Sequence, residues 1–269
     1  LKCFRYDVLL DTWDTLSDLP DSLGKIAMSA TNIDSIIYVF GGYHVFSGGS
    51  EISSNIVHRF NVNTNSFITN GSNIPVPIDD HVQGIWRDSL IYLVTGWSNT
   101  TNVPNVQIYD AKNNVWLTGS SVPNNANYNA FGASGTILND TLYYFGGAST
   151  SWNFPAQSML RKGYINPLNP TQINWSYSIP NPSIKAYRSA CTSLSSGIQW
   201  IGGSSISYNY NGLAYNGSGG VSPENRTLLY DISIDSLISL PVFGETLPMD
   251  LRGVAEFSDG TRFLAGGME

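Results

Sequence analysis

Short apolar runs, each closed by a pair of glycines, recur along the whole chain. The runs have the sequences IYVFGG, LYYFGG, IQWIGG and RFLAGG, which end in Gly41-Gly42, Gly146-Gly147, Gly202-Gly203 and Gly266-Gly267. A degenerate copy, IYLVTGW, carries Thr95 and Gly96 in place of the glycine pair. Five copies in 269 residues give about 54 residues per unit. A regular period of this size predicts a solenoid or a propeller built from stacked supersecondary units.

A second pattern accompanies the glycine pairs, in which an aromatic residue is followed seven positions later by another large residue. The pairs are Tyr6 and Trp13, Phe60 and Phe67, Tyr109 and Trp116, and Tyr230 and Leu237. One unit stretches the interval to Tyr164 and Trp175, with INPLNPTQIN inserted. The residues between the partners are rich in Asp and Asn, which predicts a tight turn and places each pair on one hairpin. A proline then marks the end of the outer strand, at Pro20, Pro75, Pro123, Pro180 and Pro241.

Together these markers resemble the kelch repeat. The matching residues are the glycine pairs, the Tyr-Asp pairs Tyr6-Asp7, Tyr109-Asp110 and Tyr230-Asp231, and the tryptophans Trp13 and Trp116. The resemblance covers essentially the whole chain. It implies a β-propeller of four-stranded blades around a central channel.

The two ends of the chain complement each other. Residues 249–269 supply two inner strands, and residues 1–20 supply two outer strands. We therefore predict one all-β domain over residues 1–269, a five-bladed kelch-type propeller whose last blade is closed by pairing of the N-terminal and C-terminal strands. The predicted blades are residues 24–77, 79–123, 126–180, 185–241, and 249–269 joined to 1–20. Closure removes exposed sheet edges, whereas exchange of residues 1–20 with a neighbouring chain would give a swapped oligomer or filament.

Composition narrows the range of partners. Charged residues are 12% of the chain, against about a quarter in an average protein, and the net charge is −7. An acidic chain is a poor partner for nucleic acid or an anionic membrane surface, and no run of 18 apolar residues predicts a membrane span. Cys3 and Cys191 form no disulfide framework, and the three histidines share no metal-ligand spacing. We expect no metal and no cofactor.

Aligning the innermost strand of each unit on its glycine pair predicts a ring of residues at the mouth of the channel. The ring contains Lys25, His81, Asn129, Arg188 and Arg252. Converging guanidinium groups bind carboxylate, sulfate or phosphate, which suggests an anionic ligand such as a carboxylated or sulfated sugar. The alternative is that these side chains bond to loop carbonyls of the next blade.

Long loops after the glycine pairs are predicted to open on the same face and to carry aromatic residues among Asn, Ser and Gly. These loops span residues 43–54, 97–104, 148–158 and 204–224, and their candidate binding residues are Tyr43, Trp97, Trp152, Tyr208 and Tyr210. Aromatic faces beside amides suit sugar rings and suit protein partners equally well.

The resemblance also bears on enzyme functions. Kelch-like copper radical oxidases need two Tyr, two His and a cross-linked Cys, which this chain does not offer near the channel. Kelch-like sialic acid mutarotases act on a carboxylated sugar, which Arg188 and Arg252 would hold. Ring opening needs a general acid or base, for which the candidates are Asp79, Asp80, His81, Asp250 and Glu256. The same acidic residues commonly cap turns.

Six Asn-X-Ser/Thr triplets with no central proline are candidate glycosylation sites, at Asn70, Asn99, Asn139, Asn174, Asn216 and Asn225. They agree with a secreted or cell-surface protein. The abrupt start at Leu1 suggests that an upstream segment is removed. We predict an extracellular binding or structural module for a glycan or protein, and no catalytic residue is assigned. The alternatives are a mutarotase-like sugar isomerase and a filament subunit formed by self-association.

Overall fold

The computed structural model describes residues 2–244, 246–257 and 259–269 of the chain. These residues form antiparallel β-strands joined by turns and loops, and they include no helix. Four sheets have four strands each, and four smaller sheets have two strands each. The all-β architecture with repeated four-stranded antiparallel sheets agrees with the propeller that the sequence predicts.

Each four-stranded sheet takes its strands in chain order. The first contains β3 (Ser29–Ile33), β4 (Ile36–Phe40), β7 (Val57–Asn61) and β8 (Ser66–Ile68). The second contains β9 (Val82–Trp86), β10 (Leu90–Val94), β13 (Val106–Asp110) and β14 (Val115–Thr118). The third contains β15 (Phe131–Leu138), β16 (Thr141–Ala148), β17 (Leu160–Asn166) and β18 (Asn169–Ser178). The fourth contains β19 (Ala190–Ser193), β20 (Gly197–Ile201), β21 (Arg226–Asp231) and β22 (Ser236–Pro241).

The two-stranded sheets lie at the chain ends and in the loops. The end sheets are β1 (Phe4–Asp7) with β2 (Thr12–Thr15), and β23 (Ala255–Glu256) with β24 (Arg262–Phe263). The loop sheets are β5 (Tyr43–Val45) with β6 (Glu51–Ser53), and β11 (Trp97–Ser98) with β12 (Thr101–Asn102).

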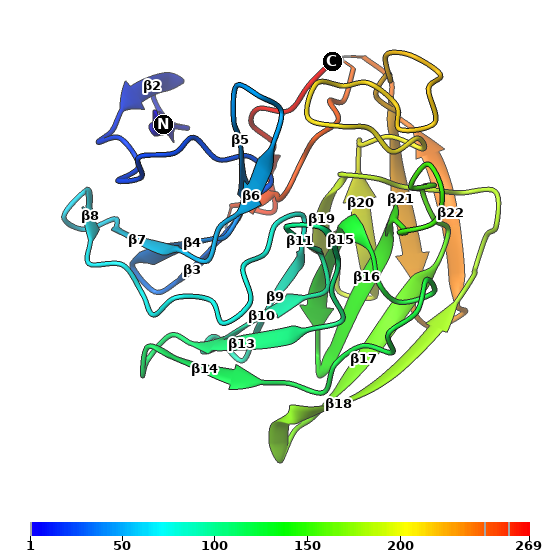
Figure 1. The fold of residues 1–269 in the computed structure, drawn as a ribbon, viewed down its shortest axis with the longest axis horizontal. Coiled ribbons are helices and arrows are strands. Elements are labelled where there is room, and N and C mark those ends of the chain that lie inside the picture. The colour runs from blue at the N-terminus through cyan, green and yellow to red at the C-terminus, as the bar shows by residue number, and fades with distance from the viewer. Residues whose placement is uncertain (1, 245, 258) are drawn as a thin grey trace.

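The sheets follow one another around a common axis in chain order, from blue through cyan and green to orange (Figure 1). The first strands of neighbouring sheets contact each other near this axis, β15 with both β9 and β19. The β1–β2 hairpin and the C-terminus both lie in the upper part of the picture (Figure 1). The pairing that the sequence predicts between the two chain ends is not found in the described residues, since β1–β2 and β23–β24 form separate sheets.

The predicted hairpin pairs are found with one change of register. Tyr6 pairs with Trp13, and the same arrangement holds for Phe60 with Phe67, Tyr109 with Trp116 and Tyr230 with Leu237. In the third sheet, however, Trp175 pairs with Gly163 and not with Tyr164. A Cβ on Gly163 would lie 2.4 Å from the Trp175 ring, so the indole covers the glycine and requires it.

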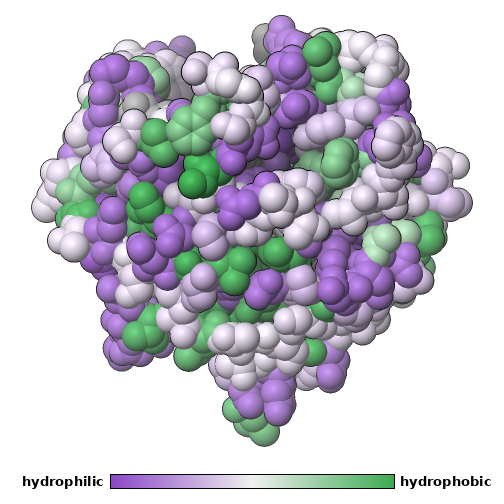
Figure 2. Space-filling model, in the orientation of Figure 1, coloured by the Kyte–Doolittle hydropathy of each residue, from purple (hydrophilic) through white to green (hydrophobic). Residues whose placement is uncertain are grey.

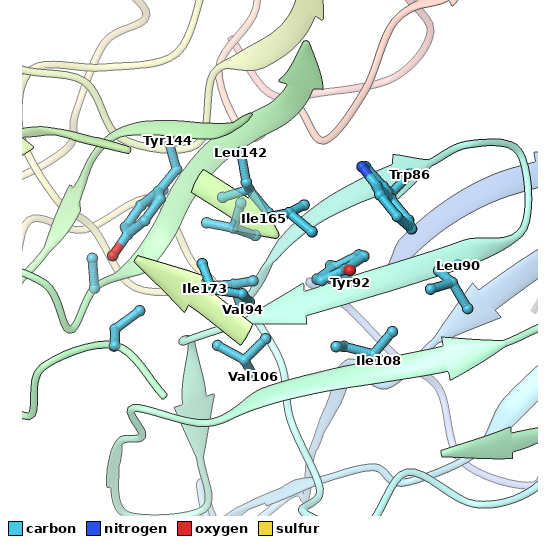
Figure 3. Packing of buried hydrophobic residues seen from close by; sticks show 14 residues of the cluster. Trp86, Leu90, Tyr92, Val94, Val106, Ile108, Leu142, Tyr144, Ile165 and Ile173 are labelled. Atoms are coloured by element: carbon cyan, nitrogen blue, oxygen red, sulfur yellow. The ribbon is translucent and has the colours of Figure 1, made fainter. Parts of the chain in front are cut away.

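The hydrophobic core lies between the faces of successive sheets. Between the second and third sheets, Tyr92 and Val94 face Leu142 and Ile165, and all four are at most 1% exposed (Figure 3). Each such side chain contributes about 1.5–3 kcal/mol to folding by its burial. The Tyr92 hydroxyl donates to the Pro170 carbonyl at 2.8 Å. The polar tip of this core aromatic is therefore satisfied by the backbone of the next sheet.

The glycine pairs join each sheet to the next. The N–H of Gly42 donates to the Ile78 carbonyl in the segment that leads to the second sheet, at 3.0 Å. That same carbonyl lies 2.0 Å from where a Cβ on Gly41 would stand. The first glycine therefore makes room for the carbonyl, and the second donates to it. The arrangement repeats at Gly146-Gly147 with Ala186 and at Gly202-Gly203 with Pro248.

The degenerate copy makes the connection to the next sheet through a side chain. Thr95 replaces the first glycine and keeps the left-handed backbone conformation, with φ of 46°. Its Oγ1 accepts a hydrogen bond from the Ala130 N–H at 3.2 Å. A side-chain oxygen thus anchors the connection to the third sheet.

Candidate functional site

One left-handed residue per unit marks the true register at the mouth of the channel. These residues are Ala27, Asp80, Gly132, Arg188 and Asp250, with φ between 50° and 65°. Backbone hydrogen bonds run from one to the next: Asp80 N–H to Ala27, Gly132 N–H to Asp80, and Arg188 N–H to Gly132. The Leu251 N–H then donates to Arg188. The chain of bonds fixes the side chains of different sheets at one level.

Of the predicted ring residues, Arg188 is itself one of these left-handed residues. His81 follows the left-handed residue of its unit by one position, Arg252 follows its own by two, and Lys25 and Asn129 precede theirs. The offsets at His81 and Arg252 follow from loop length, because the interval from the left-handed residue to the glycine marker is longer in their units. In the other three units that interval is constant, so Lys25 and Asn129 precede the left-handed residue because the alignment of their strands on the glycine pairs is loose.

The side chains of Lys25 and Asn129 contact residues away from the cavity that the other predicted ring residues line. The Lys25 Nζ lies 2.5 Å from Asp21 Oδ2 and 3.3 Å from His58 Nε2, in a buried cluster against the first sheet. Asn129 donates to the Asn124 carboxamide at 2.7 Å and is 7% exposed. The sequence-predicted members that the structure brings together are His81, Arg188 and Arg252, which line one cavity.

An ionic cluster crosses the channel at this level. Arg188 donates to both Asp80 oxygens, through Nε at 3.1 Å and Nη2 at 2.6 Å, and through Nη1 to Asp250 at 3.1 Å. The Arg252 Nη2 lies 2.5 Å from Asp80 Oδ1. The Arg188 guanidinium also lies over Tyr187 and Tyr208, 5.2 and 5.3 Å from their ring centroids. Two arginines and two aspartates from three units therefore compensate each other.

The pKa values of the neighbouring residues Asp79 and Asp80 are shifted in opposite directions. Burial alone would raise the pKa of Asp80, but the charges of Arg188 and Arg252 lower that pKa below its ordinary value. Burial and the charge of Asp80 raise the pKa of Asp79 well above its ordinary value. Asp79 accepts from the Ser53 hydroxyl at 2.6 Å. Asp80 is thus a charged partner of the arginines, and Asp79 keeps its proton to a higher pH than an ordinary aspartate does.

Above this cluster lies a pocket of about 130 Å³ with an aromatic wall, which we name the aromatic pocket. Its lining residues are Tyr43, Glu51, Asp79, Asp80, Trp97, Phe131, Phe154, Arg188, Asn209 and Tyr215. The wall comes from loops of four sheets, as the repeat pattern predicts. Burial raises the pKa of Glu51 and of Tyr215, which keeps these groups protonated over a wider range of pH.

Below the cluster the channel forms a second cavity of about 340 Å³. Its wall is rich in small and hydroxyl-bearing residues, among them Ser29, Thr31, Ser134, Thr136 and Thr192. Burial lowers the pKa of His81 to about 3, so the imidazole that lines this cavity is neutral at physiological pH. Arg188 lines both cavities, and the ionic cluster separates them.

The predicted aromatic residues divide into three groups. Tyr43 and Trp97 line the aromatic pocket. Tyr208 is fully buried beneath it, against Tyr187 at 5.1 Å. Trp152 and Tyr210 are 90% and 42% exposed and do not line it. Position in a loop does not tell a pocket residue from a surface residue, because the loop folds back through contacts distant in sequence.

The structure adds Glu51, Phe131, Asn209 and Tyr215 to the candidate site, together with Phe154. Phe131 opens strand β15 and was hidden among apolar strand residues. Phe154 and Tyr215 stand in the predicted loops, where the aromatic content was visible in the sequence. Glu51 carried no recognisable sequence signal.

Five of the six candidate glycosylation residues are exposed, and only Asn225 is partly buried. The Asn225 Nδ2 donates to the Val242 carbonyl at 2.9 Å. On the face shown in Figure 2, apolar residues form small groups among polar ones. Cys3 and Cys191 are both free and half-buried.

Within the described residues, no group of three or more His, Cys, Asp or Glu side chains is arranged to hold a metal ion. The described part of the chain also contains no helix of the length and apolarity needed to cross a membrane.

No protein-family model matches the chain, and no curated protein sequence matches it. A solved structure, that of YjhT, is similar to the chain with a TM-score of 0.71 and 16% sequence identity. The likeness covers 94% of this chain and 83% of YjhT. At this identity the likeness shows the fold alone, and it agrees with the propeller architecture described above.

Proposed function

We propose that this chain is a kelch-like propeller that binds a compact polar ligand, such as a sugar ring, in the aromatic pocket. The observation that carries the proposal is the composition of the pocket: aromatic rings form its wall, and the buried carboxyl groups of Asp79 and Asp80 line its base. Pockets with apolar walls and a few placed polar groups are typical ligand sites. Tyr43, Trp97 and Arg188 are predicted binding residues that also line this pocket.

The charges favour a ligand that is not an anion. Arg188 and Arg252 are each paired with Asp80, and Asp250 lies within 3.6 Å of both. An anion would have to displace a buried carboxylate from a guanidinium, which costs several kcal/mol, on the order of 3–5. Asn209 and Asp79 instead offer hydrogen-bonding groups that suit hydroxyls.

A matched pair of tryptophan variants tests this proposal. Trp97 lines the aromatic pocket, whereas Trp152 lies on a neighbouring loop and is 90% exposed. A glycan array and titration calorimetry should show binding by the wild type. The affinity should fall by at least about tenfold in Trp97→Ala and should change little in Trp152→Ala. Equal loss in both variants would place binding on the loop surface, and no binding at all would refute the proposal.

A second candidate function is sugar isomerisation of the mutarotase type. It is favoured by Asp79, a buried acid that holds its proton beside the ionised Asp80. Such a pair provides a proton donor and an acceptor for opening a hemiacetal ring. Mutarotation of sialic acid and of neutral aldoses, followed by NMR, should be accelerated by the wild type and not by Asp79→Asn.

We also infer that the propeller has five blades and closes on itself. Supporting this, the Tyr6 ring stacks on the Phe263 ring with centroids 4.7 Å apart, which joins the β1–β2 hairpin to the β23–β24 hairpin. The hairpin also contacts the first sheet, since Cys3, Phe4 and Leu16 line an apolar cavity together with Phe60 and Phe67. In this proposal residues 1–20 complete the last blade through side-chain packing, because β1–β2 and β23–β24 are separate two-stranded sheets in the described chain.

An extracellular location and glycosylation complete the proposal. The exposed Asn70, Asn99, Asn139, Asn174 and Asn216 are its candidate sites. Asn225 should remain unmodified, because its side chain is engaged with Val242 and Leu247. Intact-mass measurement of native protein before and after glycosidase treatment, with peptide mapping, tests both statements.

A further inference from the structure

The aromatic pocket has a corner-shaped wall. Phe131 lies 5.3 Å from Trp97, 5.7 Å from Phe154 and 6.1 Å from Tyr215, centroid to centroid. The interplanar angles in these pairs are 64°, 80° and 79°, so Phe131 is parallel to none of the three rings. Trp97 and Phe154 are inclined at 81°. A flat sugar stacks best on a single open face, whereas steeply inclined rings enclose a compact, rounded group.

The formal charges around the pocket do not balance. Four carboxyl groups belong to the pocket and the ionic cluster behind it, those of Glu51, Asp79, Asp80 and Asp250. Two guanidinium groups, those of Arg188 and Arg252, face them. Both guanidiniums are engaged by Asp80 and Asp250. Glu51 and Asp79 therefore have no cationic partner within ion-pairing distance among the described residues.

The two uncompensated carboxyl groups are placed at different depths. Asp79 is 2% exposed, and its one side-chain hydrogen bond within the described chain comes from Ser53. Glu51 is exposed at the rim, on strand β6. A positive group entering between the rings would meet one carboxyl at the base and another at the rim.

We propose that the ligand of the aromatic pocket carries a protonated or quaternary ammonium group. The inference rests on the proposed ligand-binding function and specifies its chemical class. Inclined aromatic rings attract such a cation through their electron-rich faces, and the unpaired carboxyl groups of Glu51 and Asp79 supply its counter-charge. The ammonium is part of either a small alkylammonium compound or an amino sugar.

Binding of the cation should release protons. Burial raises the pKa of Glu51, and burial with the charge of Asp80 raises that of Asp79. The other charged and titratable groups that face them are Arg188, Tyr43 and Tyr215, with Arg252 and Asp250 behind. A bound positive charge favours the ionised carboxylates, so affinity should rise as pH increases above the ordinary pKa range of a carboxyl group.

Two pairs of probes differ in charge at nearly constant shape. Choline is compared with 3,3-dimethylbutan-1-ol, its uncharged counterpart, and glucosamine is compared with glucose. Binding is measured by titration calorimetry and by the NMR signal of the Trp97 indole N–H, which a Trp97→Phe variant assigns. The Trp97 indole donates to the Asn99 carbonyl at 3.2 Å, so its signal reports on an ordered side chain.

We expect at least one cationic probe to bind about tenfold more tightly than its neutral counterpart. Preference for choline indicates an alkylammonium ligand, and preference for glucosamine alone indicates an amino sugar. Glu51→Gln should weaken the cationic probe by about threefold to tenfold. The control, Glu269→Gln, removes the same charge from an exposed residue outside the aromatic pocket and should change little.

The two possible failures differ. Equal or tighter binding of the neutral probes at the Trp97 signal would overturn the ammonium inference and leave the proposed pocket function intact. Absence of any response at Trp97, to cationic and neutral probes alike, would overturn both.

Discussion

Two adjacent aspartates show how far local surroundings decide the state of a residue. Asp79 and Asp80 are 2% and 3% exposed, so burial disfavours the charged form of both. Only Asp80 reaches the guanidiniums of Arg188 and Arg252, at 2.6 and 2.5 Å. Buried charges persist where they are paired. The pairing therefore separates a structural carboxylate from a proton-holding acid at neighbouring positions.

Replacing Asp80 by Asn should destabilise the protein strongly. The variant leaves Arg188, 2% exposed, without its bidentate partner, and breaking a buried pair on one side costs about 3–5 kcal/mol. Asp250→Asn is the matched control, because the Asp250 side chain is 33% exposed. This substitution should lower the free energy of unfolding by only about 1 kcal/mol or less. Urea unfolding at neutral pH measures both. Equal losses would mean that Asp80 does not hold the centre of the cluster.

Replacing Asp79 by Asn should have the opposite effect at neutral pH. The pKa of Asp79 in the folded state lies above its ordinary value of 3.8. Its contribution to stability is therefore complete below pH 3.8 and is lost as pH rises through the raised value. Asn keeps an oxygen for the Ser53 hydroxyl without this loss. We expect Asp79→Asn to be more stable than the wild type at neutral pH.

Unfolding of both proteins from mildly acidic to mildly alkaline pH tests the assignment. The difference in free energy of unfolding between variant and wild type should grow with pH. Parallel curves over this range would show that Asp79 titrates normally.

At the scale of the element, the glycine pair is a joint between sheets. The first glycine in most copies faces a backbone carbonyl of the next unit, and a Cβ added to it would stand 2.0 to 2.4 Å from that oxygen. The last copy differs, because a Cβ on Gly266 would meet nothing within 4 Å. Both kinds have positive φ. Comparing the copies therefore distinguishes the need for space beside the carbonyl from the need for a positive φ.

We expect Gly146→Ala to be far more damaging than Gly266→Ala. Either change places a side chain on left-handed backbone, at a cost of about 1–2 kcal/mol. At Gly146 the new Cβ would also lie 2.1 Å from the Ala186 carbonyl oxygen and would force the sheets apart, which adds about 1–3 kcal/mol. Thermal unfolding of the two variants measures the difference. Similar losses would show that conformation, and not contact with the next sheet, selects glycine here.

The features that the sequence predicts correctly are those set by residues close together in the chain. The glycine pairs and the Tyr6–Trp13 type of hairpin depend on neighbours within about ten residues, so their pattern is visible along the chain. The ionic cluster joins Arg188 to Asp80, 108 positions away, and to Asp250, 62 positions away. No local pattern records such pairs. Arg252 stands two positions after the left-handed Asp250, because the interval from that residue to the glycine pair is longer in the last unit than in the unit of Arg188.

At the scale of the whole molecule, the chain ends decide whether the ring is complete. Between units, backbone bonds lead from Ala27 to Asp80, Gly132, Arg188 and Leu251. Side chains continue the ring beyond that point. Tyr6 stacks on Phe263 within an interplanar angle of 8°. Asp21, just after the N-terminal hairpin, lies 2.5 Å from Lys25 and 3.1 Å from His58 of the first sheet. These contacts place the N-terminal hairpin between the last unit and the first.

Closure within one chain predicts a monomer whose stability does not depend on protein concentration. Tyr6→Ala, Phe263→Ala and the double variant form a cycle that should yield a coupling of about 0.5–1.5 kcal/mol, the range for a stacked aromatic pair. Tyr6→Ala with Tyr177→Ala is the control, since Tyr177 packs against Tyr128 and should be additive with Tyr6.

The coupling alone does not distinguish closure from exchange, because a swapped oligomer would form the same ring contact between two chains. Concentration does distinguish them. In an oligomer, the unfolding midpoint rises with protein concentration by mass action, whereas in a self-closed propeller it stays constant. Light scattering should give the mass of one chain, and the midpoint should be unchanged over a roughly hundredfold range of concentration. A rising midpoint together with a persistent Tyr6–Phe263 coupling would establish the exchanged assembly, and the edge of the last sheet would then be the surface that joins one molecule to the next.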